Sequence, residues 1–139
     1  MKKQALTLVG VLSLLLAAGS AFAQTGEIRA SVPFNFIVNR MALPAGDYTI
    51  STAGGSDQVL VIRSNSGKAL KLATANHVQA NQPSKSTKLV FRCYGDRYFL
   101  SQVWTRGNAR GRQLPKSALE TEVAMDFTPH DVILVASLR

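Results

Sequence analysis

Cysteine is almost absent from this chain, which contains Cys93 alone, and histidine occurs only at His77 and His130. One cysteine excludes an internal disulfide, and a zinc site needs three or four ligands, usually with a characteristic spacing. The chain also lacks the hydrolase motifs G-x-S-x-G, S-x-x-K and H-E-x-x-H, and no glycine-rich phosphate loop precedes a helix. The sequence therefore predicts no metal site, no cofactor and no catalytic residue, which indicates a protein that is not an enzyme.

Acidic residues are scarce as well. Eight Asp and Glu stand against sixteen Lys and Arg, which gives a formal charge of +8. Such an excess favours attraction to polyanions but carries no information about the fold. In an exported protein the polyanions would be envelope glycans or lipid head groups, and export argues against nucleic acid as a partner.

The N-terminus has the pattern of a secretory signal peptide. Two lysines precede a short apolar run at residues 5–16, and the small-x-small sequence AFA before Gln24 is a cleavage site. The apolar run is shorter than the roughly 20 residues that span a bilayer, and no stop-transfer segment follows it. We expect cleavage between Ala23 and Gln24, which leaves a chain with no membrane span.

The mature chain would comprise residues 24–139, with residues 1–23 as the signal peptide. It has 14 basic and 8 acidic side chains, a charge of +6, in 116 residues. This length fits one domain that buries its own core without disulfides or metal. We predict a single exported domain, in the periplasm or the extracellular space.

Alternation of apolar and polar residues predicts a β-rich domain. From Ile28 to Val38 every second residue is apolar, which is the period of a half-buried strand. Pro33 cannot donate to a ladder, so this strand is either an edge or is broken there. Shorter runs predict further strands at residues 48–52, 58–64, 69–75, 88–94, 97–105 and 131–139. The polar segments 76–86 and 106–116 are expected to be loops.

One helix is expected near the C-terminus. Ser117 and Glu120 form a capping-box signature, in which the serine side chain bonds the Glu120 amide and the glutamate reaches back. A helix over residues 118–125 would place Leu119 and Val123 on one face. About seven or eight short strands with one short helix predict an all-β domain, either an antiparallel sandwich or a small barrel. The sequence does not choose between these two.

Residues 87–105, TKLVFRCYGDRYFLSQVWT, hold the only cysteine, the only tryptophan and two of the three tyrosines. A turn at Gly95-Asp96 predicts a hairpin. Its register pairs Tyr94 with Arg97, Cys93 with Tyr98, Arg92 with Phe99, Phe91 with Leu100, and Val90 with Ser101. One face is then apolar, with Leu89, Phe91, Cys93, Tyr98, Leu100 and Trp104. The other face is mixed, with Lys88, Val90, Arg92, Tyr94, Arg97, Phe99, Ser101 and Val103.

This register gives the two faces different roles. Cys93 lies on the apolar face, so we predict a buried structural thiol; the alternative is a reactive thiolate. On the mixed face, Arg92 beside Phe99 and Arg97 beside Tyr94 form cation–aromatic pairs. Such pairs either shield the sheet from water or form a recognition surface for a partner.

The segment 106–116 carries four basic residues and no acidic one. It is either a solvated loop or a docking site for an anionic polymer or lipid head group, because the guanidinium fork matches phosphate and carboxylate. Together with the mixed face, it supplies the candidate binding residues, which are Arg92, Tyr94, Arg97, Phe99, Arg106, Arg110, Arg112 and Lys116.

Four segments, VPFNF, LPAGDYTI, KLVFRCYGDRYFLSQVW and GRQLPKSALE, cover most of residues 32–122. They resemble a group of small exported bacterial β-proteins that share, in this order, VPF-x-F, LPAG-x-Y, KLVF-x-x-YGD-x-YFL-x-x-W and GR-x-LPKS. The hairpin and GR-x-LPKS are the most specific parts, and Cys93 is outside the shared pattern. The group has no assigned activity, ligand or catalytic residue, so the resemblance implies no function.

The leading hypothesis is an exported, non-enzymatic β-domain that binds an anionic envelope component or another protein. The alternatives are an assembly protein that pairs through an edge strand (residues 28–38 or 131–138), a small barrel that carries an apolar ligand, and a hydrolase whose site the sequence hides. An interior cavity of several hundred Å³ would favour the carrier, and an unpaired, uncovered terminal strand would favour assembly. The oligomeric state stays open.

Overall fold

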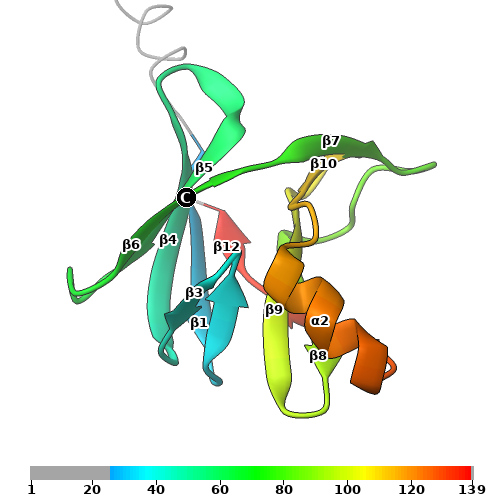
Figure 1. Ribbon diagram of the computed structural model, residues 1–139. Coiled ribbons are helices and arrows are strands. Elements are labelled where there is room, and N and C mark those ends of the chain that lie inside the picture. Colours follow the sequence, from blue (N-terminus) through cyan, green and yellow to red (C-terminus); the bar gives the residue numbers. More distant parts are fainter. Residues whose placement is uncertain (1–25, 139) are drawn as a thin grey trace, which may run out of the picture.

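The computed structural model describes residues 26–138, which form an all-β sandwich with one helix (Figure 1). The first sheet has, in order, β12 (Ser137–Leu138), β1 (Ile28–Val32), β4 (Gly46–Ala53), β5 (Ser56–Ser64) and β6 (Leu70–Thr74). The second has β11 (His130–Val135), β8 (Lys88–Tyr94), β9 (Arg97–Trp104), β10 (Arg110–Gln113) and β7 (Asn76–Gln79), with β2 (Phe36–Val38) beside β9 and β3 (Met41–Leu43) beside β2. The predicted all-β class is confirmed, in its sandwich form. The predicted signal peptide and its cleavage site lie outside these residues.

The chain passes directly between the two sheets at four corners, one of which is Pro44-Ala45 between β3 and β4. β6 continues into β7 through Ala75 alone, and β11 continues into β12 through Ala136 alone. Short hydrogen bonds hold both corners: the Ala75 N–H donates to Gln58 O at 2.7 Å, and the Ala136 N–H to Thr87 O at 2.8 Å. The third corner is residues 33–35, between β1 and β2, so the predicted strand over residues 28–38 is broken at its proline. Strands that switch sheets at such corners are typical of two packed β-layers.

All the predicted strands are present, although residues 28–38 and 131–139 each form two strands, and the two segments predicted as loops contain further strands. β1 buries Ile28, Ala30 and Val32 and exposes the residues between them, as predicted. It is nevertheless not an edge, because it lies between β12 and β4. The predicted loops 76–86 and 106–116 contain β7 and β10, which pair with each other. These two strands are short and polar. Their sequences show no apolar alternation because backbone pairing, and not a buried apolar face, stabilises them.

The space between the sheets is filled largely by aromatic and aliphatic side chains. The Phe36 ring lies edge-on to Phe91, with centroids 5.6 Å apart, and to Tyr48, with centroids 5.0 Å apart. The Tyr48 hydroxyl donates to Pro44 O at 2.6 Å, which satisfies the one polar atom of that ring. All three rings are at most 3% exposed, so they form the centre of the main core.

The β8–β9 hairpin confirms four of the five predicted pairs, and its register then shifts at a β-bulge between Val90 and Phe91. Beyond the bulge, Val90 lies opposite Gln102 and Leu89 lies opposite Val103. Val103 therefore joins the core at 1% exposure, whereas Trp104 lies on the outer face. The predicted faces of these two residues are wrong, because one extra residue in a strand exchanges the faces that follow it.

Trp104 packs directly on Gly111 of β10, which has no room for a side chain. A Cβ at Gly111 would lie 2.7 Å from two Trp104 ring carbons. We expect Gly111→Ala to lower the free energy of unfolding by about 1–3 kcal/mol, because a well-packed site must be forced apart. Urea unfolding, followed by the fluorescence of the only tryptophan, measures this. Gly26→Ala is the control, since its Cβ would meet only the Leu138 side chain; equal losses in both variants would contradict the prediction.

Candidate functional site

The mixed face of the hairpin is covered rather than exposed. Helix α2 (Ala118–Asp126) lies over β8 and β9 (Figure 1) and buries Tyr94 to 1% and Phe99 to 2% exposure. These two rings lie edge to face, 5.6 Å apart, and pack with Val123 in a small second core. The helix itself confirms the sequence prediction. The placement of Tyr94 and Phe99 on an exposed recognition surface is wrong.

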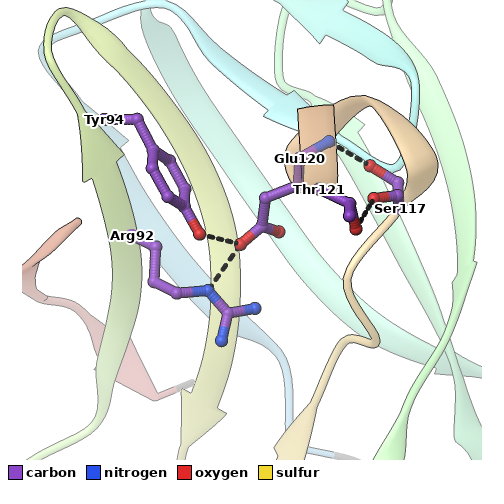
Figure 2. Close-up of polar contacts among 5 residues, drawn as sticks. All are labelled: Arg92, Tyr94, Ser117, Glu120 and Thr121. Atoms are coloured by element: carbon purple, nitrogen blue, oxygen red, sulfur yellow. Dashed lines mark hydrogen bonds and ion pairs between the residues drawn. The ribbon is translucent and has the colours of Figure 1, made fainter. Parts of the chain in front are cut away.

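Glu120 joins this helix to the sheet (Figure 2). Its Oε2 accepts from Arg92 Nε at 2.7 Å and from the Tyr94 hydroxyl at 2.8 Å. The Glu120 side chain is 4% exposed and that of Arg92 is 15% exposed. Ser117 Oγ accepts from the Glu120 N–H at 3.2 Å, as predicted, but the Glu120 carboxylate turns to the sheet instead of reaching back. Arg92 therefore has an internal partner and is not part of a free basic surface.

The same contacts change the pKa of Tyr94 and make the stability of the fold depend on alkaline pH. Burial, followed by the hydrogen bond to Glu120, raises the pKa of Tyr94 from 10.0 to about 12. The neutral phenol therefore stabilises the fold fully below pH 10, and this contribution is lost as the pH rises through about 12. We expect the parent to lose more stability than Tyr94→Phe between these pH values. Urea unfolding of both proteins across this range is the measurement, and parallel losses would contradict it.

Cys93 is buried, as predicted from its place on the apolar face. It is 1% exposed, and its Sγ–H donates to Gly95 O at 3.2 Å. A buried thiol of this kind behaves as a small apolar group. Its chemical inertness stays a prediction.

The remaining basic candidates do not form one surface. Arg97 lines a cavity at the hairpin turn, and Arg106 lines another beside the end of β11. Lys116 is exposed just before the helix. Only Arg110 and Arg112 lie together, on one side of β10 and in the same cavity.

That cavity has a volume of about 160 Å³ and lies between β10, β7 and the start of β5. His77 is opposite Arg112 across the two strands, and its Nε2 is 3.3 Å from Asp57 Oδ2. Burial lowers the pKa of Arg112, and the Asp57 carboxylate partly offsets this effect. Sequence reasoning missed Asp57 because it comes from the other sheet, and no spacing along the chain indicates its approach.

One terminal strand of the second sheet is β11. The Ala136 N–H bonds to Thr87, and this register continues the pairing of β11 with β8. Successive residues of an antiparallel strand bond alternately to the two sides. Asp131, Ile133 and Val135 therefore direct their N–H and C=O groups away from β8, where no described strand pairs with them.

The outer face of β11 is apolar and exposed. Ile133 is 59% and Val135 is 69% exposed, and both lie beside Val90 or Lys88 of β8. Natural edge strands are usually protected by short length, charge, proline or a bulge. Of the other terminal strands, β12 has two residues and β3 has three, β7 reads NHVQ, and β6 carries Lys71. β11 carries the charged Asp131 near its start, but from Val132 to Val135 it has no charge, proline or bulge.

Comparison of the chain with protein-family models, with curated proteins and with solved structures found no match. The resemblance to small exported bacterial proteins therefore stays a prediction. Within residues 26–138, no three His, Cys, Asp or Glu side chains come together in a way that could hold a metal ion. No helix in that part of the chain is long and apolar enough to cross a membrane.

Proposed function

We propose that this protein is an exported, non-enzymatic assembly domain, in which two copies pair through their β11 strands. The observation that carries the proposal is the row of backbone groups at Asp131, Ile133 and Val135 on a terminal strand, with which no strand within residues 26–138 pairs. Strand addition at such an edge supplies backbone hydrogen bonds, and the neighbouring side chains supply specificity. The exposed apolar face of β11 supplies those side chains.

An antiparallel pair centred on Ile133 uses every unpaired group of the strand. Ile133 then lies opposite Ile133 of the second copy, and each Asp131 lies opposite a Val135. The three residues of each copy form three hydrogen-bonded pairs, which make one sheet continuous across both molecules. The two Ile133 side chains meet at the centre of the interface, so their exposed surface leaves water on pairing.

The charges around β11 are compatible with self-pairing. Asp131 lies opposite Arg92 of its own β8, and Val135 lies opposite Lys88. In the proposed register each Asp131 is two strands, about 10 Å, from Lys88 of the second copy. The two Asp131 side chains are four residues apart, about 13 Å, so like charges do not face each other. This complementarity favours a second copy as the occupant of the edge.

The leading hypothesis from the sequence and one of its alternatives lose support. The aromatic recognition surface is covered by α2, which removes Tyr94 and Phe99 from contact with a partner. An apolar carrier would need space between the sheets, and the rings of Phe36 and Phe91 occupy its centre. Of the basic candidates, Arg110 and Arg112 line one cavity together, which supports a separate binding role.

Export is tested on the protein that cells make from the complete chain. We expect mass spectrometry of the secreted or periplasmic material to find Gln24, in its free or cyclised form, at the N-terminus. A protein that retains Met1 would contradict the export part of the proposal. The same processed material is the sample for the association measurements, so that residues 1–23 cannot cause association themselves.

Sedimentation of this processed protein over a wide concentration range tests the assembly. The proposal predicts a reversible shift from the mass of one chain to the mass of two as concentration rises. A single-chain mass at every concentration would contradict it. Growth beyond two copies would also contradict it, because an isologous pair closes on itself.

A further inference from the structure

We propose that the cavity between β7, β10 and β5 binds one tetrahedral oxyanion group, a phosphate or a sulfate, that a ligand outside this chain carries. Its principal ligands would be Arg112 and Arg110, with His77 beside them. The cavity and β11 lie at opposite ends of the second sheet, so this site and the proposed assembly can fail independently.

The two arginines reach the cavity without a hydrogen-bonded or ion-paired acceptor. Neither the Arg110 nor the Arg112 side chain makes a hydrogen bond or ion pair with any residue that the structure describes. Arg112 is half-buried, and the Asp57 carboxylate raises its pKa without forming an ion pair with it. An oxyanion would supply that acceptor, since charge-assisted and bidentate hydrogen bonds are the strongest that arginine forms.

The other lining groups suit an anion with several oxygens. Asn108 Oδ1 accepts from the Arg110 N–H at 3.0 Å, which leaves the Asn108 amide group as a donor. Thr105, whose side chain carries a hydroxyl, lines the same cavity. Two guanidinium groups, an amide and a hydroxyl offer more donors than the two oxygens of a carboxylate can use. A phosphate or sulfate group, with three or four acceptor oxygens, matches this set better.

The size of the cavity limits what can enter. Its volume of about 160 Å³ equals the space of about five water molecules in the liquid. One phosphate or sulfate group fits this space, and the rest of a larger ligand would extend out of it. The site therefore holds the charged group of a larger ligand or the free ion.

Substitutions at Asp57 and at Arg112 should change the affinity for an anion in opposite directions. Its carboxylate is the one acidic group that lines the cavity, and it is 64% exposed beside His77. An entering anion must compete with this charge for Arg112. Asp57→Asn should therefore strengthen anion binding, whereas Arg112→Ala should weaken it.

The experiment titrates the processed protein with inorganic phosphate, sulfate and acetate while amide chemical shifts are recorded by NMR. We expect saturable shifts at Arg110, Arg112 and His77 with phosphate or sulfate, and weaker binding of acetate. Arg112→Ala should lower the affinity at least tenfold. Asp57→Asn should raise it about fivefold. Arg63→Ala removes the same charge from an exposed position in β5 and should change the affinity little.

Several results would overturn the site. They are the absence of saturable shifts in the parent, equal losses in Arg63→Ala and Arg112→Ala, and weaker binding by Asp57→Asn. Acetate that binds as tightly as phosphate would overturn the tetrahedral group. If Arg112→Ala does not fold, Arg112→Lys keeps the charge without the planar fork and should still weaken binding.

Discussion

Glu120→Ala is expected to lower the free energy of unfolding by about 3–5 kcal/mol, because it breaks a buried ion pair from one side. The variant would leave the Arg92 guanidinium at 15% side-chain exposure without its carboxylate, and the Tyr94 hydroxyl without an acceptor. A loss of this size is a large fraction of the stability of a small domain. Helix α2 would then lose its hydrogen bonds to Arg92 and Tyr94 of β8.

The matched control for this loss is Glu122→Ala. Glu122 lies in the same helix, two residues away, and is exposed. The two variants remove the same charge and both introduce alanine, so helix propensity and net charge cancel in the comparison. Urea unfolding should show a change within about 0.5 kcal/mol for Glu122→Ala. If both variants lose the same stability, Glu120 is not the link between helix and sheet.

Ile133→Lys is expected to convert the assembled protein into single chains at concentrations where the parent is paired. In the proposed register the substitution places two like charges at the centre of the interface, opposite each other, which is destabilising in a sheet. A lysine on an edge strand is also the means by which natural sheets avoid pairing. The free energy of unfolding should change little, because the Ile133 side chain is 59% exposed and its backbone groups do not bond to β8.

Leu72→Lys is the control for this variant. Leu72 lies on the terminal strand β6 of the other sheet and is 57% exposed, close to the value for Ile133. Sedimentation should show that Leu72→Lys pairs like the parent. Loss of pairing in Leu72→Lys instead of Ile133→Lys would move the interface to β6. An equal loss in both would show that general charge, not the β11 edge, controls association.

The local features of this fold could be predicted from the sequence. The period-two alternation from Ile28 defines a half-buried strand because every second side chain is apolar and gains stability on burial. The Ser117 cap is equally local, since the serine and the amide it accepts from are three residues apart. Pro33 marked a break because its missing N–H is a property of the residue itself.

Features that depend on distant residues could not be predicted. Glu120 bonds Arg92 and Tyr94, which lie 28 and 26 positions earlier, so the covered face of the hairpin was interpreted as open. The bulge after Val90 could not be recognised in the sequence, because Val103 and Trp104 are both apolar and either could face the core. The candidate cavity also depends on distant residues. Arg110 and Arg112 were identified by charge, whereas Asp57 was missed because it reaches them from the other sheet.

Amide hydrogen exchange along β11, measured at low and high protein concentration, tests the proposed assembly most directly. The N–H groups of Asp131, Ile133 and Val135 point to the open edge, whereas those of Val132 and Leu134 bond to β8. We predict that exchange at the first three residues slows as concentration rises, while Val132 and Leu134 are protected throughout. Equal, concentration-independent exchange at Asp131, Ile133 and Val135 would contradict pairing through β11.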